Sequence, residues 1–241
     1  MTYEKIHKLL EELKFRGMAD ILDDVLINAE KEGTSVRDAL HELLAGELRY
    51  RRERSLIYRM EKAKIPWNWT LSSFPFDKQP AVKKSRIMEL ADARFVERGE
   101  NIVFIGDTGA GKSGLASGLL REAILAGYRG LFYNVQNLLD DLYASLADRT
   151  TSKMLKSLCR YDILVLDELG YLTLSSEQMN AFFKLMAERY QANKSTVITT
   201  NLDYDKWYGL FKPKDMVDAL LDRLQHHCIT IRIEGKSLRK L

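Results

Sequence analysis

The chain has 241 residues and is long enough to bury a large hydrophobic core in one or two domains. Its hydrophobic share of 46% and charged share of 29% are typical of a soluble globular protein, and no run of about 18 apolar residues occurs, which excludes a transmembrane helix. The net charge of +3 is too small to identify a nucleic-acid partner by itself. A polar amino terminus without a signal-peptide core predicts a cytoplasmic protein, in which Cys159 and Cys228 are reduced and buried.

Residues 1–64 are predicted to form a small all-α domain. Apolar residues recur at helical spacing in three successive stretches. We expect the first helix to end at Gly17 and the second at Gly33, because glycine commonly closes helices. Thr34 or Ser35 is expected to cap a third helix that continues to about residue 64.

Charge is unevenly distributed within this region. Residues 1–48 contain six Lys and Arg against eleven Asp and Glu, whereas residues 49–64 contain seven against two. The region therefore has an acidic body and a basic end. The basic run fits either a solvated helix face or a surface for DNA or a partner protein.

Residues 65–81 interrupt the helical pattern. Proline and aromatic residues are mixed there, namely Pro66, Trp67, Trp69, Phe74, Pro75, Phe76 and Pro80. Proline breaks regular elements, and the aromatic rings need apolar surface to cover them. We interpret the segment as a linker that packs on the following domain.

From residue 82 onward, strands alternate with helices. The expected strands lie at 102–106, 131–134, 162–167, 196–200 and 229–233, and the expected helices at 82–97, 135–158, 176–192 and 215–227. Such alternation predicts an α/β domain over 82–241, in which a parallel sheet is covered by helices on both faces.

The first strand runs into a phosphate-binding loop, Gly106-x-x-x-x-Gly111-Lys112-Ser113. Its glycines let backbone N–H groups point at phosphate oxygens, and Lys112 reaches the outer phosphates. A helix that starts at Ser113 directs its amino terminus at the same phosphates. The pattern predicts binding of a nucleoside triphosphate, ATP, with Mg²⁺ through Gly106, Asp107, Thr108, Gly109, Ala110, Gly111, Lys112, Ser113 and Gly114.

Polar residues end the third and fourth strands. Asp167 follows an apolar run and is predicted to hold Mg²⁺ together with Ser113. Glu168 is predicted to polarise a water for attack on the γ-phosphate, which indicates hydrolysis rather than binding alone. Asn201 fits either a turn residue or a side chain that bridges this water and the γ-phosphate.

Two arginines near the carboxyl end complete the predicted catalytic set. Arg223, in an amphipathic helix, fits either a surface arginine paired with a nearby aspartate or a finger that completes the site of a neighbouring subunit. Arg239 fits either a free terminal charge or a contact to the γ-phosphate of its own subunit. His226 and His227 lack metal-ligand spacing and are interpreted as structural or solvent-facing.

Four segments carry a resemblance to a known family. They are the phosphate loop, Leu164-Val-Leu-Asp-Glu-Leu-Gly-Tyr-Leu172, Thr199-Thr-Asn-Leu202 and Leu220-Leu-Asp-Arg-Leu-Gln-His-His227. Together they resemble the IstB family of transposition helper ATPases from bacterial insertion sequences, relatives of the DnaC-type helicase loaders in the AAA+ class. The resemblance covers essentially the whole chain. It departs from the family pattern at Ser113, at Leu238 and in the short tail after Arg239.

The resemblance implies an AAA+ core that assembles head to tail as a homo-oligomer on duplex DNA, shapes the target DNA, and recruits or regulates a cognate transposase. It implies that residues 1–64 contact a partner or DNA, that Arg223 acts in trans, and that Arg239 is a second sensor. In related loaders and initiators the segment after the second strand lines the pore, which makes Arg149, Lys153 and Lys156 candidate DNA phosphate contacts. No membrane partner is expected.

Two alternatives stay open at this point. A DnaC-like helicase loader shares every catalytic motif and differs in its partner. A nucleotide-dependent binding or scaffold protein, in which turnover is incidental, would keep the phosphate loop without needing Glu168 as a base.

Overall fold

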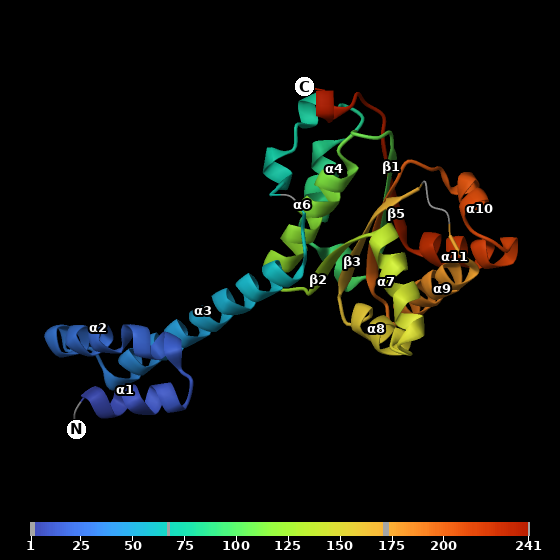
Figure 1. Ribbon diagram of the computed structural model, residues 1–241. Helices are drawn as coiled ribbons and strands as arrows, with labels where there is room; N and C mark the ends of the chain where they lie inside the picture. Colours follow the sequence, from blue (N-terminus) through green and yellow to red (C-terminus); the bar gives the residue numbers. More distant parts are fainter. Residues whose placement is uncertain (1–2, 67, 171–173, 241) are drawn as a thin grey trace. The chain divides into compact units, whose positions relative to one another are not determined.

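The chain divides into two compact units, Met1–Tyr58 and Arg59–Leu241, in a computed structural model that describes residues 3–66, 68–170 and 174–240 (Figure 1). Trp67 of the predicted linker, and Tyr171 and Leu172 of the second family segment, lie outside the described residues. The first unit contains α1 (Tyr3–Glu12), α2 (Arg16–Glu32) and the start of α3 (Val36–Lys62), a helix that continues into the second unit. None of the described helices combines the length and apolar character needed to cross a membrane.

The helices of the first unit pack around a small apolar core that includes Leu10, Leu22 and Leu43. Two predicted helix boundaries are confirmed. Gly33 ends α2 with a φ of 70° and donates its N–H to the carbonyl of Ala29. Ser35 precedes α3, and its hydroxyl accepts a hydrogen bond of 3.2 Å from the N–H of Asp38.

The prediction that Gly17 ends the first helix is wrong. Helix α1 ends at Glu12, and Lys14 makes the turn with a φ of 60° before α2 begins. Gly17 lies where α2 approaches α3, because a Cβ atom at this position would lie only 2.5 Å from the Cβ of Tyr50. The glycine therefore permits close helix contact, a requirement that hydrophobic periodicity does not reveal.

The basic run predicted at residues 49–64 begins on a solvent-exposed stretch of α3. Arg49, Arg52 and Arg54 are exposed, and Arg51 is paired with the buried Glu47 at 2.6 Å. The run therefore presents most of its positive charge to solvent.

The second unit is built on a five-stranded sheet. The strands are β1 (Asn101–Gly106), β2 (Gly130–Asn134), β3 (Ile163–Leu169), β4 (Ser195–Thr200) and β5 (Cys228–Ile233), and they pair in the order β2-β3-β4-β1-β5. Every pairing is parallel, as predicted. The carboxyl ends of all five strands therefore lie at one edge of the sheet.

Helices cover both faces of this sheet (Figure 1). Helix α6 (Lys112–Leu125) packs on one face, and α7 (Val135–Ala147), α9 (Ser176–Gln191) and α11 (Lys214–His226) pack on the other. The short helices α8 (Thr151–Leu158) and α10 (Trp207–Leu210) lie between these elements in the chain. The side chains between the sheet and α7, α9 and α11 form one apolar core, as the apolar run of β3 predicts.

The predicted helix at 82–97 is interrupted. It forms α4 (Lys84–Leu90) and α5 (Arg94–Glu97), separated by Ala93, which has a φ of 60°. Asp92 accepts a hydrogen bond of 3.0 Å from the N–H of Arg94 and so starts the second helix. The break is a local turn between apolar residues, which a hydrophobic pattern cannot distinguish from a continuous helix.

The aromatic segment after α3 belongs to the second unit and packs on its α/β core. It forms two short 3₁₀ turns, η1 (Leu71–Ser73) and η2 (Phe76–Lys78). Leu71 and Phe74 are buried, and η1 contacts helix α6. The chain directly after α3 is hydrogen-bonded to the edge strand β2, where the N–H of Phe132 donates to the carbonyl of Ala63 at 2.7 Å. This packing brings residues that are distant in sequence to the helix that follows the phosphate loop.

Candidate functional site

The phosphate loop connects β1 to α6 at the carboxyl edge of the sheet. Gly109 and Gly111 have φ angles of 84° and 99°, which side-chain-bearing residues rarely adopt. The Lys112 ammonium donates to the carbonyls of Gly106 and Asp107 at 2.7 and 2.8 Å. Burial lowers the pKa of Lys112, and the nearby carboxylates, led by Asp167, oppose that shift. The loop is thus folded around a half-buried cation.

Asp167 is almost fully buried beside this loop. Only 2% of the residue is exposed. Burial raises the pKa of its carboxyl group, while hydrogen bonds from Thr199 and Ser113 oppose the shift. A buried carboxylate with hydroxyl neighbours is a favourable position for a hard cation, which would compensate its charge.

Glu168 reaches the site because strand β3 is irregular there. Consecutive residues of a regular strand face opposite sides, so Asp167 and Glu168 could not both face one crevice. The register of β3 against β4 shifts between Leu166 and Leu169, and Glu168 has a φ of 62°. A positive φ is costly for glutamate and is retained where the surroundings enforce it. The backbone N–H of Glu168 donates to the Thr199 hydroxyl at 2.9 Å, which helps to fix this conformation.

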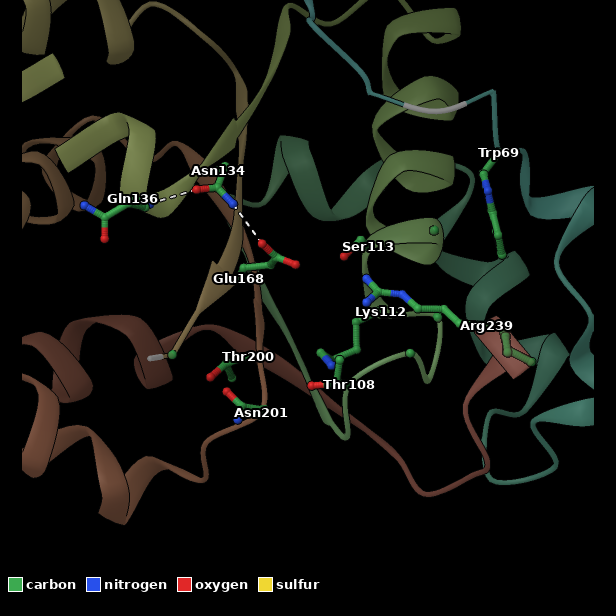
Figure 2. A pocket seen from close by; sticks show the side chains of 15 residues that line it. Trp69, Thr108, Lys112, Ser113, Asn134, Gln136, Glu168, Thr200, Asn201 and Arg239 are labelled. Atoms are coloured by element: carbon green, nitrogen blue, oxygen red, sulfur yellow. Dashed lines mark hydrogen bonds between the residues drawn. The ribbon is translucent and has the colours of Figure 1, made fainter. Parts of the chain in front are cut away.

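The Glu168 carboxylate has a partner that sequence reasoning missed. The side-chain amide of Asn134, at the end of β2, donates to Oε2 of Glu168 at 3.0 Å (Figure 2). The oxygen of the same amide accepts from the N–H groups of Gln136 and Asn137 and caps helix α7. A polar residue at the end of a strand predicts a cap, but its contact with β3 requires the sheet order.

These elements enclose one pocket of about 580 Å³ (Figure 2). Predicted site residues on its wall are Thr108, Gly109, Gly111, Lys112, Ser113, Gly114, Glu168, Asn201 and Arg239. Residues that were not predicted also line it, namely Trp69, Asn134, Gln136, Gly170, Thr200 and Leu238. Asp167 is buried behind Ser113, and Gly106, Asp107 and Ala110 complete the loop. The structure therefore brings the phosphate loop and the polar strand ends together.

Arg239 lies on the pocket wall because its segment is tied to the phosphate loop. The N–H of Leu238 donates to the carbonyl of Gly109 at 2.8 Å. The buried side chain of Gln79 donates to the carbonyl of Lys236 at 2.8 Å. These two contacts hold the carboxyl-terminal segment beside the loop, so the free-terminal interpretation of Arg239 does not describe its position.

Trp69 enters the pocket from the aromatic linker. It lies against Gly114 of α6, where a Cβ atom would come within 2.5 Å of the Trp69 ring atom Cε3. With Leu238 on the wall, the indole gives the pocket an apolar surface beside the phosphate loop. The aromatic composition of the linker indicates packing, but not the position of this ring at the phosphate loop.

Arg223 is not part of this pocket. It is exposed on α11 and lines a separate recess with Asn101 and Thr196, which lie at the amino ends of β1 and β4. The phosphate loop follows the opposite end of β1, about 16 Å away along an extended strand of this length. Arg223 therefore lies too far from the pocket of its own subunit to touch a ligand there.

The other predicted positions lie outside the pocket as well. Arg149, Lys153 and Lys156 are exposed in the turn after α7 and on α8. Cys159 and Cys228 are free thiols and only half-buried. Across residues 3–66, 68–170 and 174–240, no group of three or more His, Cys, Asp or Glu side chains forms a metal cluster.

The fold has relatives among solved structures. The chain matches the crystal structure of the DnaC helicase loader with a TM-score of 0.57 and 25% identity, covering 71% of this chain and 100% of the loader chain. It matches the replication initiator DnaA bound to AMPPCP and single-stranded DNA with a TM-score of 0.60 and 19% identity, over 72% of this chain and 52% of that one. These matches show the AAA+ P-loop fold.

Sequence relatives extend over nearly the full length. An ATP-binding protein of insertion sequence IS21 from Pseudomonas aeruginosa is 34% identical over 235 residues, covering 98% of this chain and 88% of the relative. The family model of the IstB-like ATP binding proteins matches residues 8–241. The chain therefore belongs to the IstB family of insertion-sequence ATP-binding proteins, which is related to DnaC.

Proposed function

We propose that this protein is a Mg²⁺-dependent ATPase that oligomerises head to tail on duplex DNA, shapes the target DNA, and recruits or regulates a transposase. The main support is the separation of the catalytic residues. Lys112, Glu168 and Asn201 surround one pocket, whereas Arg223 lies at the opposite end of the strands. For Arg223 to stabilise the transferring phosphoryl group, it must then act in the pocket of a second copy of the chain.

ATP fits the pocket through complementary ends. The loop N–H groups and the amino terminus of α6 offer positive partial charge to the phosphates. The Lys112 ammonium can exchange its contacts with the loop carbonyls for the outer phosphate oxygens. Trp69 and Leu238 provide apolar surface for the base. The solved DnaA relative carries the ATP analogue AMPPCP, which supports the same class of ligand.

Magnesium fits the oxygen groups beside the loop. The Ser113 hydroxyl and the buried Asp167 carboxylate are hard ligands, and Mg²⁺ usually completes its shell with water and phosphate oxygens. When bound, the ion supplies neutralisation of the charge that develops on the phosphates. Thr199 donates to Asp167 and keeps the carboxylate oriented towards Ser113.

In the proposed reaction, a water attacks the γ-phosphorus and the bond to the ADP oxygen breaks. The Glu168 carboxylate accepts the proton of this water. Asn134 donates to one oxygen of the carboxylate and orients it. Asn201 and Arg239 both line the pocket, and we assign Asn201 to bridging the water and the γ-phosphate and Arg239 to contacting that phosphate as a second sensor from the same subunit.

Replacing Asp167 with asparagine is expected to raise the melting temperature of the nucleotide-free protein by at least roughly 2 °C, because an uncompensated buried charge is removed. The pKa of Asp167 is raised in the folded state, so this carboxylate destabilises the fold as the pH rises through that pKa, and the advantage of asparagine grows over the same range. Calorimetry between pH 4 and 8 measures the difference in melting temperature between the variant and the wild type. Mg²⁺ with ATP should stabilise the wild type more than the variant. A lower melting temperature for nucleotide-free Asp167→Asn than for the wild type would contradict the assignment of Asp167 as a buried carboxylate that holds Mg²⁺.

DNA contact is proposed for Arg149, Lys153 and Lys156 and for the basic run of residues 49–64. These three side chains are exposed, as is most of the run, and they can reach a phosphate backbone. The absence of a predicted base-reading element favours weak sequence preference and strong salt dependence.

Transposition is favoured over helicase loading by the extent of the matches. The insertion-sequence relative is 34% identical over 98% of this chain, and the family model of the IstB-like ATP binding proteins matches residues 8–241. We therefore assign residues 1–64 to contacts with a transposase or DNA, residues 82–241 to ATP hydrolysis, and residues 65–81 to the connection between them. The scaffold alternative is disfavoured by the orientation of Glu168 in the pocket.

A concentration series tests the proposed function. The purified protein is titrated against a fixed length of duplex DNA, and the ATPase rate per subunit is measured at two salt concentrations, with and without a transposase of the insertion-sequence type. We expect the rate per subunit to rise with protein concentration, DNA affinity to fall steeply with salt, and the transposase to stimulate turnover. A rate per subunit that is independent of dilution would contradict a composite site, and stimulation by a replicative helicase instead would favour a loader.

A further inference from the structure

Asn101 is a buried polar residue at the start of the central strand β1. It is only 8% exposed, and its apolar neighbours Ile102 and Val103 are fully buried. A polar side chain at such a position needs specific partners. It lies in the recess that contains Arg223, at the end of the sheet opposite the pocket.

The side-chain amide, the side-chain oxygen and the backbone N–H of Asn101 each have a partner on the elements that surround Arg223. Its side-chain amide donates to the carbonyl of Leu224 at 3.2 Å, and its side-chain oxygen accepts from the N–H of Thr196 at 2.9 Å. Its backbone N–H donates to the carbonyl of His227 at 2.7 Å. The carbonyl of Leu224 belongs to the last turn of α11, where carbonyls lack helical partners. Asn101 therefore fixes the turn of α11 that carries Arg223 to the sheet.

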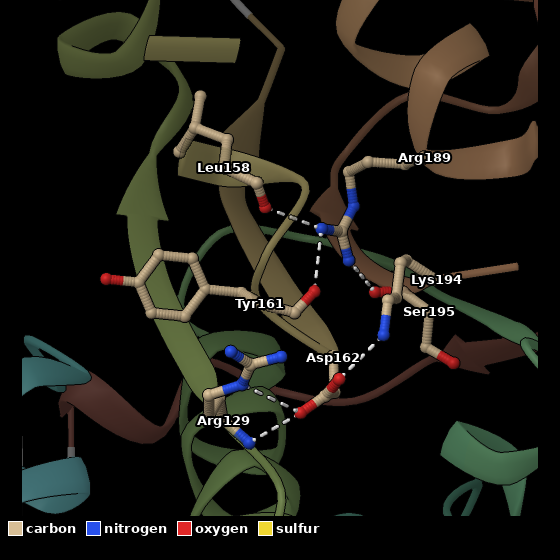
Figure 3. A network of polar contacts seen from close by, with 7 residues as sticks. All are labelled: Arg129, Leu158, Tyr161, Asp162, Arg189, Lys194 and Ser195. Carbon is tan, nitrogen blue, oxygen red and sulfur yellow. Dashed lines mark hydrogen bonds and ion pairs between the residues drawn. The ribbon is translucent and has the colours of Figure 1, made fainter. Parts of the chain in front are cut away.

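The base of this attachment is rigid. Strands β1 and β4 are both paired on two sides within the sheet. The buried Arg189 side chain further fixes the start of β4 by donating to the Thr196 hydroxyl at 3.1 Å and to the carbonyls of Leu158, Tyr161 and Ser195 (Figure 3). Burial lowers the pKa of Arg189 to about 10, so the group stays charged at neutral pH. Asp162 is held beside it by hydrogen bonds from Lys194 and Arg129 (Figure 3).

We propose that Asn101 is a positioning residue for Arg223, which it holds at the angle needed to enter the nucleotide site of a neighbouring subunit. The proposal rests on the trans role of Arg223 proposed above. The mechanism is geometric: Arg223 immediately precedes Leu224, so a shift of that turn displaces the long arginine side chain. A misplacement of about 1 Å at a reacting centre can cost about 10²-fold in rate.

The test separates the subunit that gives the arginine from the subunit that uses it. Lys112→Ala protein retains Arg223 but lacks a working phosphate loop, and Arg223→Ala protein has the reverse defect. An equimolar mixture should recover ATPase activity at interfaces where each supplies what the other lacks. Asn101→Leu, which keeps the branched shape of the side chain without its polar atoms, is then added to one component at a time.

We expect Asn101→Leu to lower the recovered kcat at least about 10-fold when it is carried by the Lys112→Ala subunit, and less than about twofold when it is carried by the Arg223→Ala subunit. A purely structural role would lower both mixtures equally and would overturn the proposal, as would no loss in either. If the unmodified mixture recovers no activity, the trans role of Arg223 itself fails and the proposal fails with it.

Two further variants keep the test decisive. Asn101→Asp retains an oxygen for the Thr196 N–H but loses the donor to Leu224, so it should reproduce the asymmetric loss if Asn101→Leu folds poorly. Tyr190→Phe is the matched control, because Tyr190 lines the same recess but its hydroxyl contacts the exposed side chain of His226 rather than the backbone of α11. It should leave both mixtures unchanged, and melting temperatures of each protein show that it is folded.

Discussion

Replacing Glu168 with glutamine is expected to lower kcat for ATP hydrolysis by about 10²–10⁴-fold while ATP binding stays close to that of the wild type. Glutamine has nearly the same shape, and its carbonyl oxygen can still accept the hydrogen bond from Asn134. It cannot take the proton of the attacking water. The lost step is therefore proton transfer, because Lys112 and the loop that bind the phosphates are unchanged.

Single-turnover hydrolysis and equilibrium binding of a fluorescent ATP analogue measure the two quantities separately. Glu177→Gln is the matched control, because it makes the same substitution at an exposed glutamate in the first turn of α9. A Glu168→Gln protein with wild-type kcat would show that Glu168 is not the base. That result would favour the scaffold alternative, which does not need Glu168 as a base.

The sequence predicted the framework of the site because each framework residue has a local signature. The phosphate loop needs glycines at fixed spacing, and the strands around it are apolar runs that end in Asp167 and Asn201. The parallel sheet follows from alternating strands and helices. In each case the physical requirement acts on neighbours in the chain, so it leaves a pattern that can be read directly.

The missed features depend on contacts between distant segments. The φ of 62° at Glu168 and the register shift in β3 arise from pairing with β4. Trp69 joins the pocket because the linker packs on α6, and Asn134 joins it because β2 lies beside β3. Sheet order and linker packing are tertiary properties, and neither periodicity nor residue type specifies them.

The placement of Arg223 and Arg239 also depends on contacts between distant segments. Both were candidates for the γ-phosphate, Arg223 in a neighbouring subunit and Arg239 in its own, and the sequence alone left a surface ion pair for Arg223 and a free terminal charge for Arg239 as alternatives. Contacts of Gln79 and Leu238 hold the segment of Arg239 beside its own phosphate loop. Arg223 is instead anchored at the amino ends of the strands. The geometry thus supports one arginine acting in cis and one in trans.

Replacing Arg223 with alanine is therefore expected to lower kcat by about 10³-fold or more, the usual scale for an arginine that stabilises a transferring phosphoryl group. ATP affinity should change little, because no contact to the pocket of the same subunit is removed. Arg223→Lys should recover little of the loss, since a lysine cannot reproduce the planar, bidentate guanidinium.

Arg239→Ala provides the contrast that identifies the trans arginine. Each variant is mixed with Lys112→Ala protein, and the recovered ATPase rate is measured as a function of total concentration. Arg223→Ala should be rescued, because the Lys112→Ala subunit still presents its arginine to a neighbour. Arg239→Ala should not be rescued, because the subunit that keeps a working phosphate loop lacks Arg239 on the wall of its own pocket. Rescue of both variants, or of Arg239→Ala alone, would contradict the assignment of Arg239 to its own subunit. A residue on the wall of its own pocket cannot be supplied by another copy unless the carboxyl-terminal segments exchange between subunits.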